Sequence, residues 1–167
     1  MDKTPWSVPV SVEDIPETGL HMEIDAPAVA RAALAQLANV RELPELSAVF
    51  DLTRRGAGAH VAGRVRARVG QTCVVSLEPI ENTIDEDVDV VFAPPSAAAG
   101  GADEPPEALS NGTLDLGALA SEFLLLAIDP YPRKAGVEFA PPKAEEGGER
   151  PFAALEALKK RMGSGKP

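Results

Sequence analysis

The sequence contains little cysteine and few aromatic residues. One cysteine occurs among 167 residues, and aromatic residues make up 4% of the chain. A single cysteine excludes a disulfide bond within the chain. Because large aromatic side chains are scarce while 44% of the residues are hydrophobic, we expect a core built from alanine, valine and leucine.

Long apolar runs are also absent. The nearest, Phe123 to Ile128, falls far short of the roughly 20 residues that span a bilayer. The opening MDKTPWSVPV lacks the basic start, apolar core and small-residue cleavage site of a signal peptide. We therefore expect a cytoplasmic protein with no membrane partner, whose length suits one domain with tails.

The residues that usually carry chemistry are few and scattered. His21 and His60 have no Cys, Asp or Glu partners at metal-ligand spacing. Cys73 and Ser76 have no histidine near them in the sequence, and no phosphate-binding loop is recognisable. We expect no enzyme activity, catalytic residue, metal, cofactor or small-molecule substrate. A reactive thiol at Cys73 is the alternative, although alternation with valines favours a small buried apolar role.

Charge is unevenly distributed in a chain whose net charge is −10. Such acidity disfavours general nucleic-acid binding, because each phosphate contact must form against overall repulsion. Between His60 and Val69, however, polar and apolar residues alternate, which places Arg64, Arg66 and Arg68 on one face of a strand.

A second alternating run follows at Asp85 to Phe92, with Asp85, Asp87 and Asp89 on one face. One interpretation pairs these carboxylates with the three arginines across an antiparallel ladder. The other leaves the arginines free for phosphate, since three alternate positions span roughly 13 Å. Arg54 and Arg55, in the turn before the basic strand, would extend such a surface.

Between the two charged runs, the residues Cys73-Val-Val-Ser76-Leu-Glu-Pro resemble the signature of the YceD family, the large ribosomal RNA subunit accumulation proteins. Two other segments fit that family: Leu114 to Leu126, with its Asp-Leu-Gly start, and Pro151 to Leu158. Many members carry C-x-x-C at the signature, and here Ser76 replaces the second cysteine, so a zinc ligand pair is not expected. The resemblance implies a non-catalytic factor that supports synthesis, processing or stability of large-subunit (23S) ribosomal RNA.

The remaining pattern predicts an α+β fold. We expect an antiparallel sheet, either open or strongly bent and barrel-like, with two main helices and a short C-terminal helix. Asp25 should cap the first helix and Asp115 the second. The predicted strands are 6–12 (an edge strand), 20–24, 46–53, 60–69, 72–77 and 85–92. The predicted helices are 28–38, with Val29, Ala33, Leu37 and Val40 as its apolar stripe, and the segment that follows Asp115, with a wide apolar arc.

We expect a single domain at 1–132 with a flexible insertion at 93–112, a flexible linker at 133–150 and a helical tail at 151–167. The tail combines an apolar stripe with a basic cluster. It could dock on the domain, fold on a partner or stay disordered. The lone Trp6 should be buried rather than serve as a ligand platform.

The resemblance implies as partners a ribosomal RNA precursor, a basic large-subunit ribosomal protein, or both. An acidic adaptor that binds protein and never touches RNA is the alternative. The candidate contact residues are Arg54, Arg55, Arg64, Arg66, Arg68, Phe152, Leu155, Leu158, Lys159, Lys160 and Arg161.

Overall fold

The structure, a computed structural model, describes residues 4–94, 106–109, 111–139 and 159. The chain divides into a compact first unit, Met1–Val137, and a second unit, Glu138–Pro167. Of the predicted linker and tail, residues 140–158 and 160–167 lie outside the described residues. They include five candidate contact residues of the tail: Phe152, Leu155, Leu158, Lys160 and Arg161. Lys159 is helical and exposed. The account below concerns the first unit.

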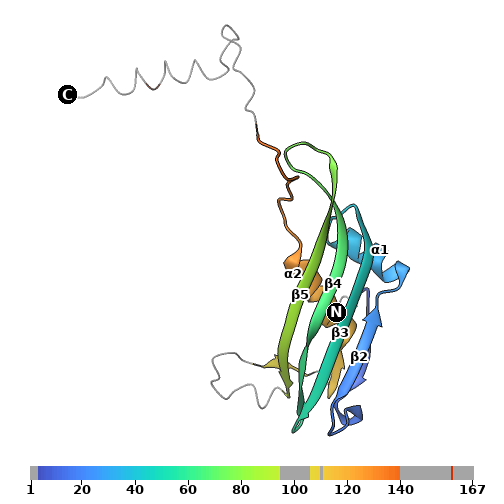
Figure 1. Ribbon diagram of the computed structural model, residues 1–167. Helices are drawn as coiled ribbons and strands as arrows, with labels where there is room; N and C mark the ends of the chain where they lie inside the picture. Colours follow the sequence, from blue (N-terminus) through green and yellow to red (C-terminus); the bar gives the residue numbers. More distant parts are fainter. Residues whose placement is uncertain (1–3, 95–105, 110, 140–158, 160–167) are drawn as a thin grey trace, which may run out of the picture. The chain divides into compact units, whose positions relative to one another are not determined.

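The first unit combines strands and two α-helices, as Figure 1 shows. The strands are β1 (Pro9–Ser11), β2 (Leu20–Asp25), β3 (Glu42–Arg55), β4 (Gly58–Thr72), β5 (Pro79–Ala93), β6 (Glu107–Ala108) and β7 (Thr113–Asp115). The helices are α1 (Ala28–Leu37), α2 (Leu116–Ala127) and a 3-10 turn, η1 (Val12–Asp14).

The main sheet has the order β2-β3-β4-β5-β6. The antiparallel prediction is confirmed for β2 to β5 but wrong for β6, which pairs with β5 in parallel. Residues 94–106 connect β5 to β6, which is long enough for a parallel return. The sheet is not closed into a barrel. Strand β6 lies within the segment predicted as a flexible insertion, whereas residues 95–105 and 110 are not described.

The segment predicted as an edge strand at 6–12 contains only the short β1. It pairs with β7 in a separate two-stranded sheet rather than with the main one. The predicted burial of Trp6 is confirmed, because its side chain belongs to the core.

Strands β4 and β5 form one long hairpin, in which Thr72 pairs with Pro79. The interruption at Gly70 allowed either a hairpin there or one long bent strand. The hairpin is wrong and the continuous strand is correct as far as Thr72, since β4 runs through Gly70. The predicted strand at 72–77 is also wrong, because residues 73–78 form the turn of the hairpin. Pro79 therefore begins a strand rather than ending one, a position that a missing N–H permits.

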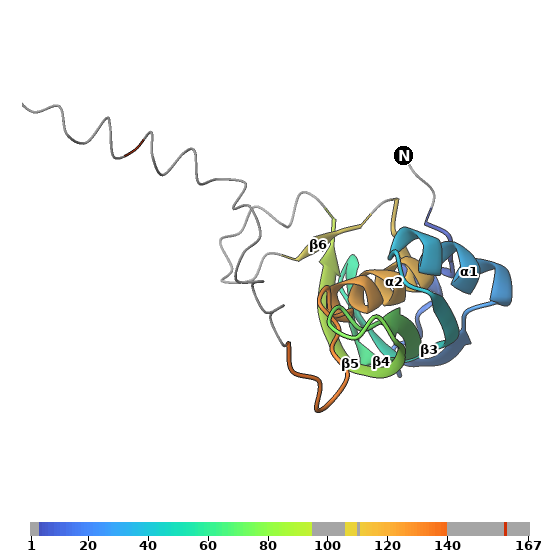
Figure 2. The ribbon, with the colours of Figure 1, turned by 90° about the horizontal axis from the view of Figure 1, so that it is seen from above.

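Both helices cover the same face of the sheet, as Figure 2 shows. The core between these layers includes Phe50 and Val65 from the sheet and Leu34 and Leu124 from the helices, all fully buried. Gly63 on β4 lies under the Phe50 ring, where an added Cβ would approach Phe50 Cδ1 to 2.8 Å. The other face of the sheet is open to solvent, and Figure 1 is viewed from that side.

Helix α1 buries a different face from the one predicted. Ala30, Leu34 and Ala35 are buried, whereas Val29 is 83% and Leu37 is 63% exposed. The predicted cap is also wrong: Asp25 ends β2, and Pro27 occupies the N-cap position without a side-chain hydrogen bond.

Helix α2 has the predicted cap, because the Asp115 carboxylate accepts the Ala118 N–H. Its buried side includes Leu116, Leu119 and Leu124. The wide apolar arc predicted for this helix is not all buried, because Leu126 is 84% exposed.

Candidate interaction surfaces

The outer face of the sheet carries the arginine row. The register of β4 and β5 sets Arg64 opposite Asp87 and Arg66 opposite Asp85. Arg64 Nη2 lies 2.6 Å from Asp87 Oδ1, and Arg66 Nε lies 3.4 Å from Asp85 Oδ1. The Asp87 hydrogen bond and the Asp85 charge raise the pKa of Arg64. The cross-strand ion-pair interpretation is confirmed for these two arginines.

Arg68 does not follow the expected pairing of three arginines with three aspartates. It stands opposite Thr83, and its guanidinium contacts Glu45 on β3 and Glu81 on β5 instead. Asp89, which was expected to pair with an arginine, binds His60 at 2.7 Å. Each arginine of the row therefore contacts at least one carboxylate.

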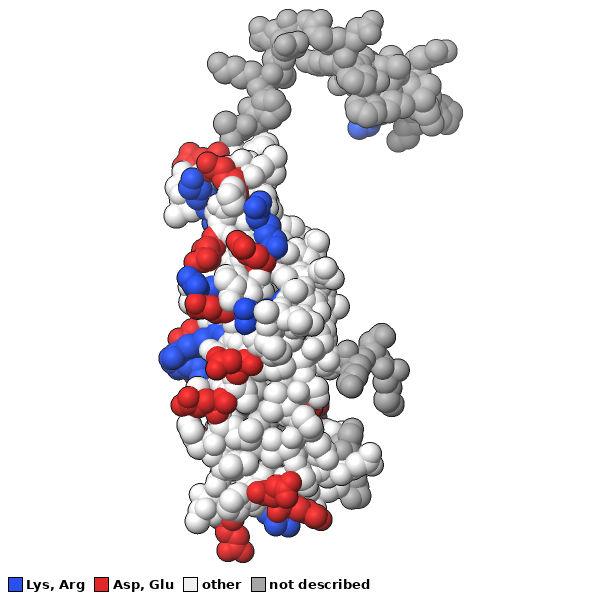
Figure 3. Space-filling model, turned by 90° about the vertical axis from the view of Figure 1, so that its right-hand side faces the viewer, with Lys and Arg blue, Asp and Glu red and all other residues white. Residues whose placement is uncertain are grey.

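Carboxylates outnumber guanidinium groups on this face. The cross-strand pairs define which residues share it, and its arginines are Arg55, Arg64, Arg66 and Arg68. Its acidic residues are Glu23, Asp25, Glu42, Glu45, Asp51, Glu81, Asp85, Asp87 and Asp89. Figure 3 shows acidic and basic side chains next to one another along one border of that view. The face is acidic, and the three arginines of its row are already paired with carboxylates.

Arg54 and Arg55 lie at the far end of β3, and they do not both extend the row. Arg54 pairs with Ala59 and points to the helix-covered face, whereas Arg55 pairs with Gly58 and points to the outer face. Within the described part of the chain, neither makes an ion pair.

A double-mutant cycle should detect the central ion pair. We expect Arg64→Glu and Asp87→Lys each to destabilise the protein slightly, and the double variant to recover a small part of that loss through the reversed pair. The recovery is small because both side chains are exposed. Urea unfolding measures it, and Arg55→Glu combined with Asp87→Lys serves as an uncoupled control. A coupling energy of zero would contradict an energetic role for the pair.

The turn of the long hairpin carries the residues that resemble the family signature. Cys73 begins this turn and is fully buried. Its sulfur accepts the backbone N–H of Ser76 at 3.4 Å and that of Lys134 at 3.3 Å. The Ser76 hydroxyl and these N–H groups lower the pKa of Cys73 to about 6.

The burial predicted for Cys73 is therefore found, but its predicted place in a valine-rich strand is wrong, and its sulfur is a hydrogen-bond acceptor rather than a purely apolar group. The described residues contain no group of three His, Cys, Asp or Glu that could hold a metal. That the chain has no enzymatic activity stays a prediction from the sequence.

The segment after α2 braces this turn, which the sequence did not reveal. The Val74 N–H donates to the Pro132 carbonyl at 2.9 Å, and Lys134 Nζ contacts Glu78 at 2.9 Å. The Gln71 side chain donates to the Asp129 carbonyl at 2.8 Å. We call residues 129–134 the strap.

A cleft of about 490 Å³ opens between the strap, the end of β4 and the loop after α1. Its apolar lining residues are Ala38, Val40, Val74, Ile128, Pro130 and Pro132, and its polar ones are Asn39, Arg41, Gln71, Thr72 and Asp129. These segments lie far apart in the sequence, so the cleft exists only in the folded chain.

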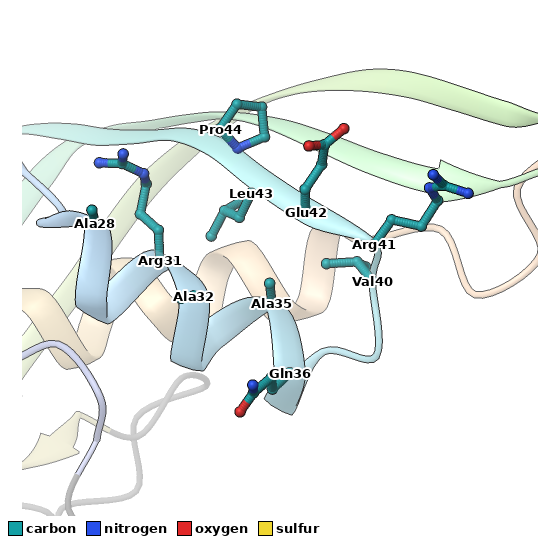
Figure 4. Close-up of a pocket in the computed structure, with 10 residues that line it drawn as sticks. All are labelled: Ala28, Arg31, Ala32, Ala35, Gln36, Val40, Arg41, Glu42, Leu43 and Pro44. Carbon is teal, nitrogen blue, oxygen red and sulfur yellow. The ribbon is translucent and has the colours of Figure 1, made fainter.

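A second hollow of about 380 Å³ lies between α1 and the start of β3 (Figure 4). Leu43 points towards the helix, while Glu42 and Pro44 point away from it. Arg31 Nη1 donates to the Ala26 carbonyl at 2.6 Å. Strand β2 ends its pairing at Ser47, and Pro44 lacks the N–H that an added strand would need along this edge.

The described part of the chain contains no helix long and apolar enough to cross a membrane. No curated protein and no solved structure matches the chain. The family model described as large ribosomal RNA subunit accumulation protein YceD matches residues 61–159, which is more than half of the chain. The match contains most of β4, all of β5, the Cys73 turn and α2. The chain therefore belongs to the YceD family of large ribosomal RNA subunit accumulation proteins.

Proposed function

We propose that this protein is a non-catalytic factor that promotes accumulation of large-subunit ribosomal RNA by binding a basic large-subunit ribosomal protein. Family membership supports the role in ribosomal RNA accumulation. The choice of a protein as the direct partner is supported by one observation: the arginine row is ion-paired within the sheet, on a face with a surplus of carboxylates.

Direct RNA binding by this face would have to break those pairs. Each phosphate contact would release a carboxylate beside it and meet the repulsion of a chain with net charge −10. A lysine- and arginine-rich protein surface, by contrast, meets complementary charge without rearrangement. The outer face therefore favours the protein partner over RNA.

Opposite charge changes should separate these two partners. Asp51 and Asp89 flank Ala62 on neighbouring strands. Among the described residues their ion pairs are with histidines, so their replacement breaks no arginine pair there. We expect Asp51→Asn with Asp89→Asn to weaken co-sedimentation with large-subunit precursors several-fold. The matched pair Arg64→Gln with Arg66→Gln should leave it unchanged or strengthen it.

The reverse result, with weaker binding after loss of the arginines and stronger binding after loss of the carboxylates, would identify RNA as the direct partner. That second candidate has one observation in its favour. Arg54 and Arg55 are exposed and make no ion pair with any described residue, so both are available to bind phosphate.

A further inference from the structure

Exposed apolar side chains gather at one end of the first unit. Eight large ones are exposed among its described residues, and five belong to segments that meet around the hairpin turn. These five are Leu37, Val74, Leu77, Leu126 and Tyr131. We call this end, together with its cleft, the hairpin-tip surface.

Leu77 is held in an unusual conformation there. Its φ is 59°, in the left-handed region that a leucine rarely adopts, and its side chain is 74% exposed. The turn imposes this geometry, because the Leu77 N–H donates to the Cys73 carbonyl at 3.0 Å and the Cys73 N–H donates to the Glu78 carbonyl at 2.9 Å. A rigid frame thus presents an apolar side chain to solvent, against both conformational and hydration preferences.

The cleft borders the turn that holds this leucine. Val74 belongs to the same turn and lines the cleft, while Pro130 and Pro132 form another wall. Tyr131, between the two prolines, is 71% exposed. A cavity of about 490 Å³, lined by apolar and polar residues in similar measure, is large enough for one bulky side chain of a partner.

Charge at the hairpin-tip surface is balanced. Arg41 and Asp129 both line the cleft, so their charges offset each other there. Lys134 is paired with Glu78. A single-stranded RNA would need an excess of free cations, so this surface suits a weakly charged partner.

The patch is also small. Even if all five side chains are counted as one patch, its area is on the order of the roughly 300 to 600 Å² of the largest apolar patches on monomers. A stable homodimer needs roughly 800 Å² from each partner. The area therefore fits a short segment better than a second copy of the chain.

We propose that the hairpin-tip surface docks a short, largely apolar segment of a partner protein, which inserts one large side chain into the cleft. This is a different surface from the acidic outer face, and the inference rests on the proposed function only for the choice of probe. The framed Leu77 and the exposed Tyr131 are its main contacts.

Leu77→Gly separates the stability of the fold from the affinity for the partner, because the substitution should affect the two in opposite directions. Glycine adopts a φ of 59° without strain, so the midpoint of thermal unfolding should stay the same or rise. Loss of the leucine side chain should nevertheless weaken binding to large-subunit precursor particles at least tenfold. Val29→Ser, which removes an exposed apolar side chain of α1 away from both surfaces, should leave binding unchanged.

A photo-activated cross-linker at position 131 then identifies the occupant, with precursor particles and with the RNA-free total protein of the large subunit as probes. A cross-link to a large-subunit protein in both probes is expected. A cross-link only to RNA, or only to a second copy of the chain, would overturn the inference, as would unchanged binding of Leu77→Gly.

Binding by the wild-type protein distinguishes failure of the docking inference from failure of the proposed function. If it binds neither probe, the proposed function and the docking inference both fail. If it binds and Leu77→Gly binds equally well, the docking inference alone fails, and the acidic outer face remains as the contact.

Discussion

Replacing Asp115 by alanine is expected to lower the free energy of unfolding by about 2 to 3 kcal/mol. One carboxylate oxygen accepts the Val8 N–H at 2.8 Å and the Ala118 N–H at 3.0 Å, and the other accepts the Ser7 hydroxyl at 2.6 Å. The side chain therefore caps α2 and also fastens the N-terminal segment to it. Alanine leaves the donors of both segments without this acceptor.

The Asp115 effect should depend on pH. Burial raises the pKa of this carboxyl, but the hydrogen bonds from Ser7, Val8 and Ala118 prevail, and the pKa falls below its ordinary value. The stabilisation is thus complete above the pKa of the unfolded chain and is lost as pH falls through the lower folded value. Urea unfolding should show that the difference in free energy of unfolding between wild type and Asp115→Ala is smaller at pH 3 than at pH 7.

Two other substitutions make the Asp115 measurement specific. Asp115→Asn keeps one acceptor oxygen and should be intermediate. Glu122→Ala removes an exposed acid from the same helix and should change stability by less than about 0.5 kcal/mol. Equal stability of Asp115→Ala and wild type at pH 7 would contradict the role of the carboxylate.

The long strands were predictable because each has one face on the core and one in water. Period-two alternation marks this condition locally, so β3, β4 and β5 were found, and the arginine and aspartate rows were placed opposite each other. Even the ion pairs followed from alternation. The exact partners did not, because the turn sets the register: Arg68 faces Thr83 rather than an aspartate.

Helix α1 shows why an alanine-rich pattern misleads. Its sequence AVARAALAQL offers apolar residues on every side, so periodicity does not select a buried face. The larger Val29 and Leu37 suggested one stripe, yet the sheet accepts the side that contains Leu34. The fit of the helix to the surface of the sheet decides which side is buried, and only the folded chain specifies that surface.

The hairpin-tip surface was not predictable as a site. Val74 and Val75 are β-branched, so the sequence suggested a strand where the chain turns. The positive φ of Leu77 has no sequence signal, because glycine or asparagine is the usual occupant of that region. The strap joins the turn across more than 50 residues, a contact that no local pattern encodes.

Replacing Cys73 by alanine should destabilise the protein by about 2 to 3 kcal/mol. The substitution removes a buried sulfur and leaves the Ser76 and Lys134 N–H groups without their acceptor. Both the turn and its brace to the strap depend on these bonds, so the hairpin-tip surface should loosen first. Amide hydrogen exchange should therefore speed up at Ser76 and Lys134 more than in the centre of β4. Cys73→Ser, which keeps an acceptor, is the matched control and should lose less.

The thiol also predicts a pH dependence that the alanine variant lacks. Because the folded pKa of Cys73 is about 6, below the ordinary value of roughly 8.5, the unfolded chain binds more protons between these two values. The stability of the wild type relative to Cys73→Ala should thus increase from pH 6 to pH 8.5 and level off above it. Denaturant unfolding across this range measures the difference. A constant difference would show that the sulfur stays protonated, and its role would then be that of a neutral acceptor.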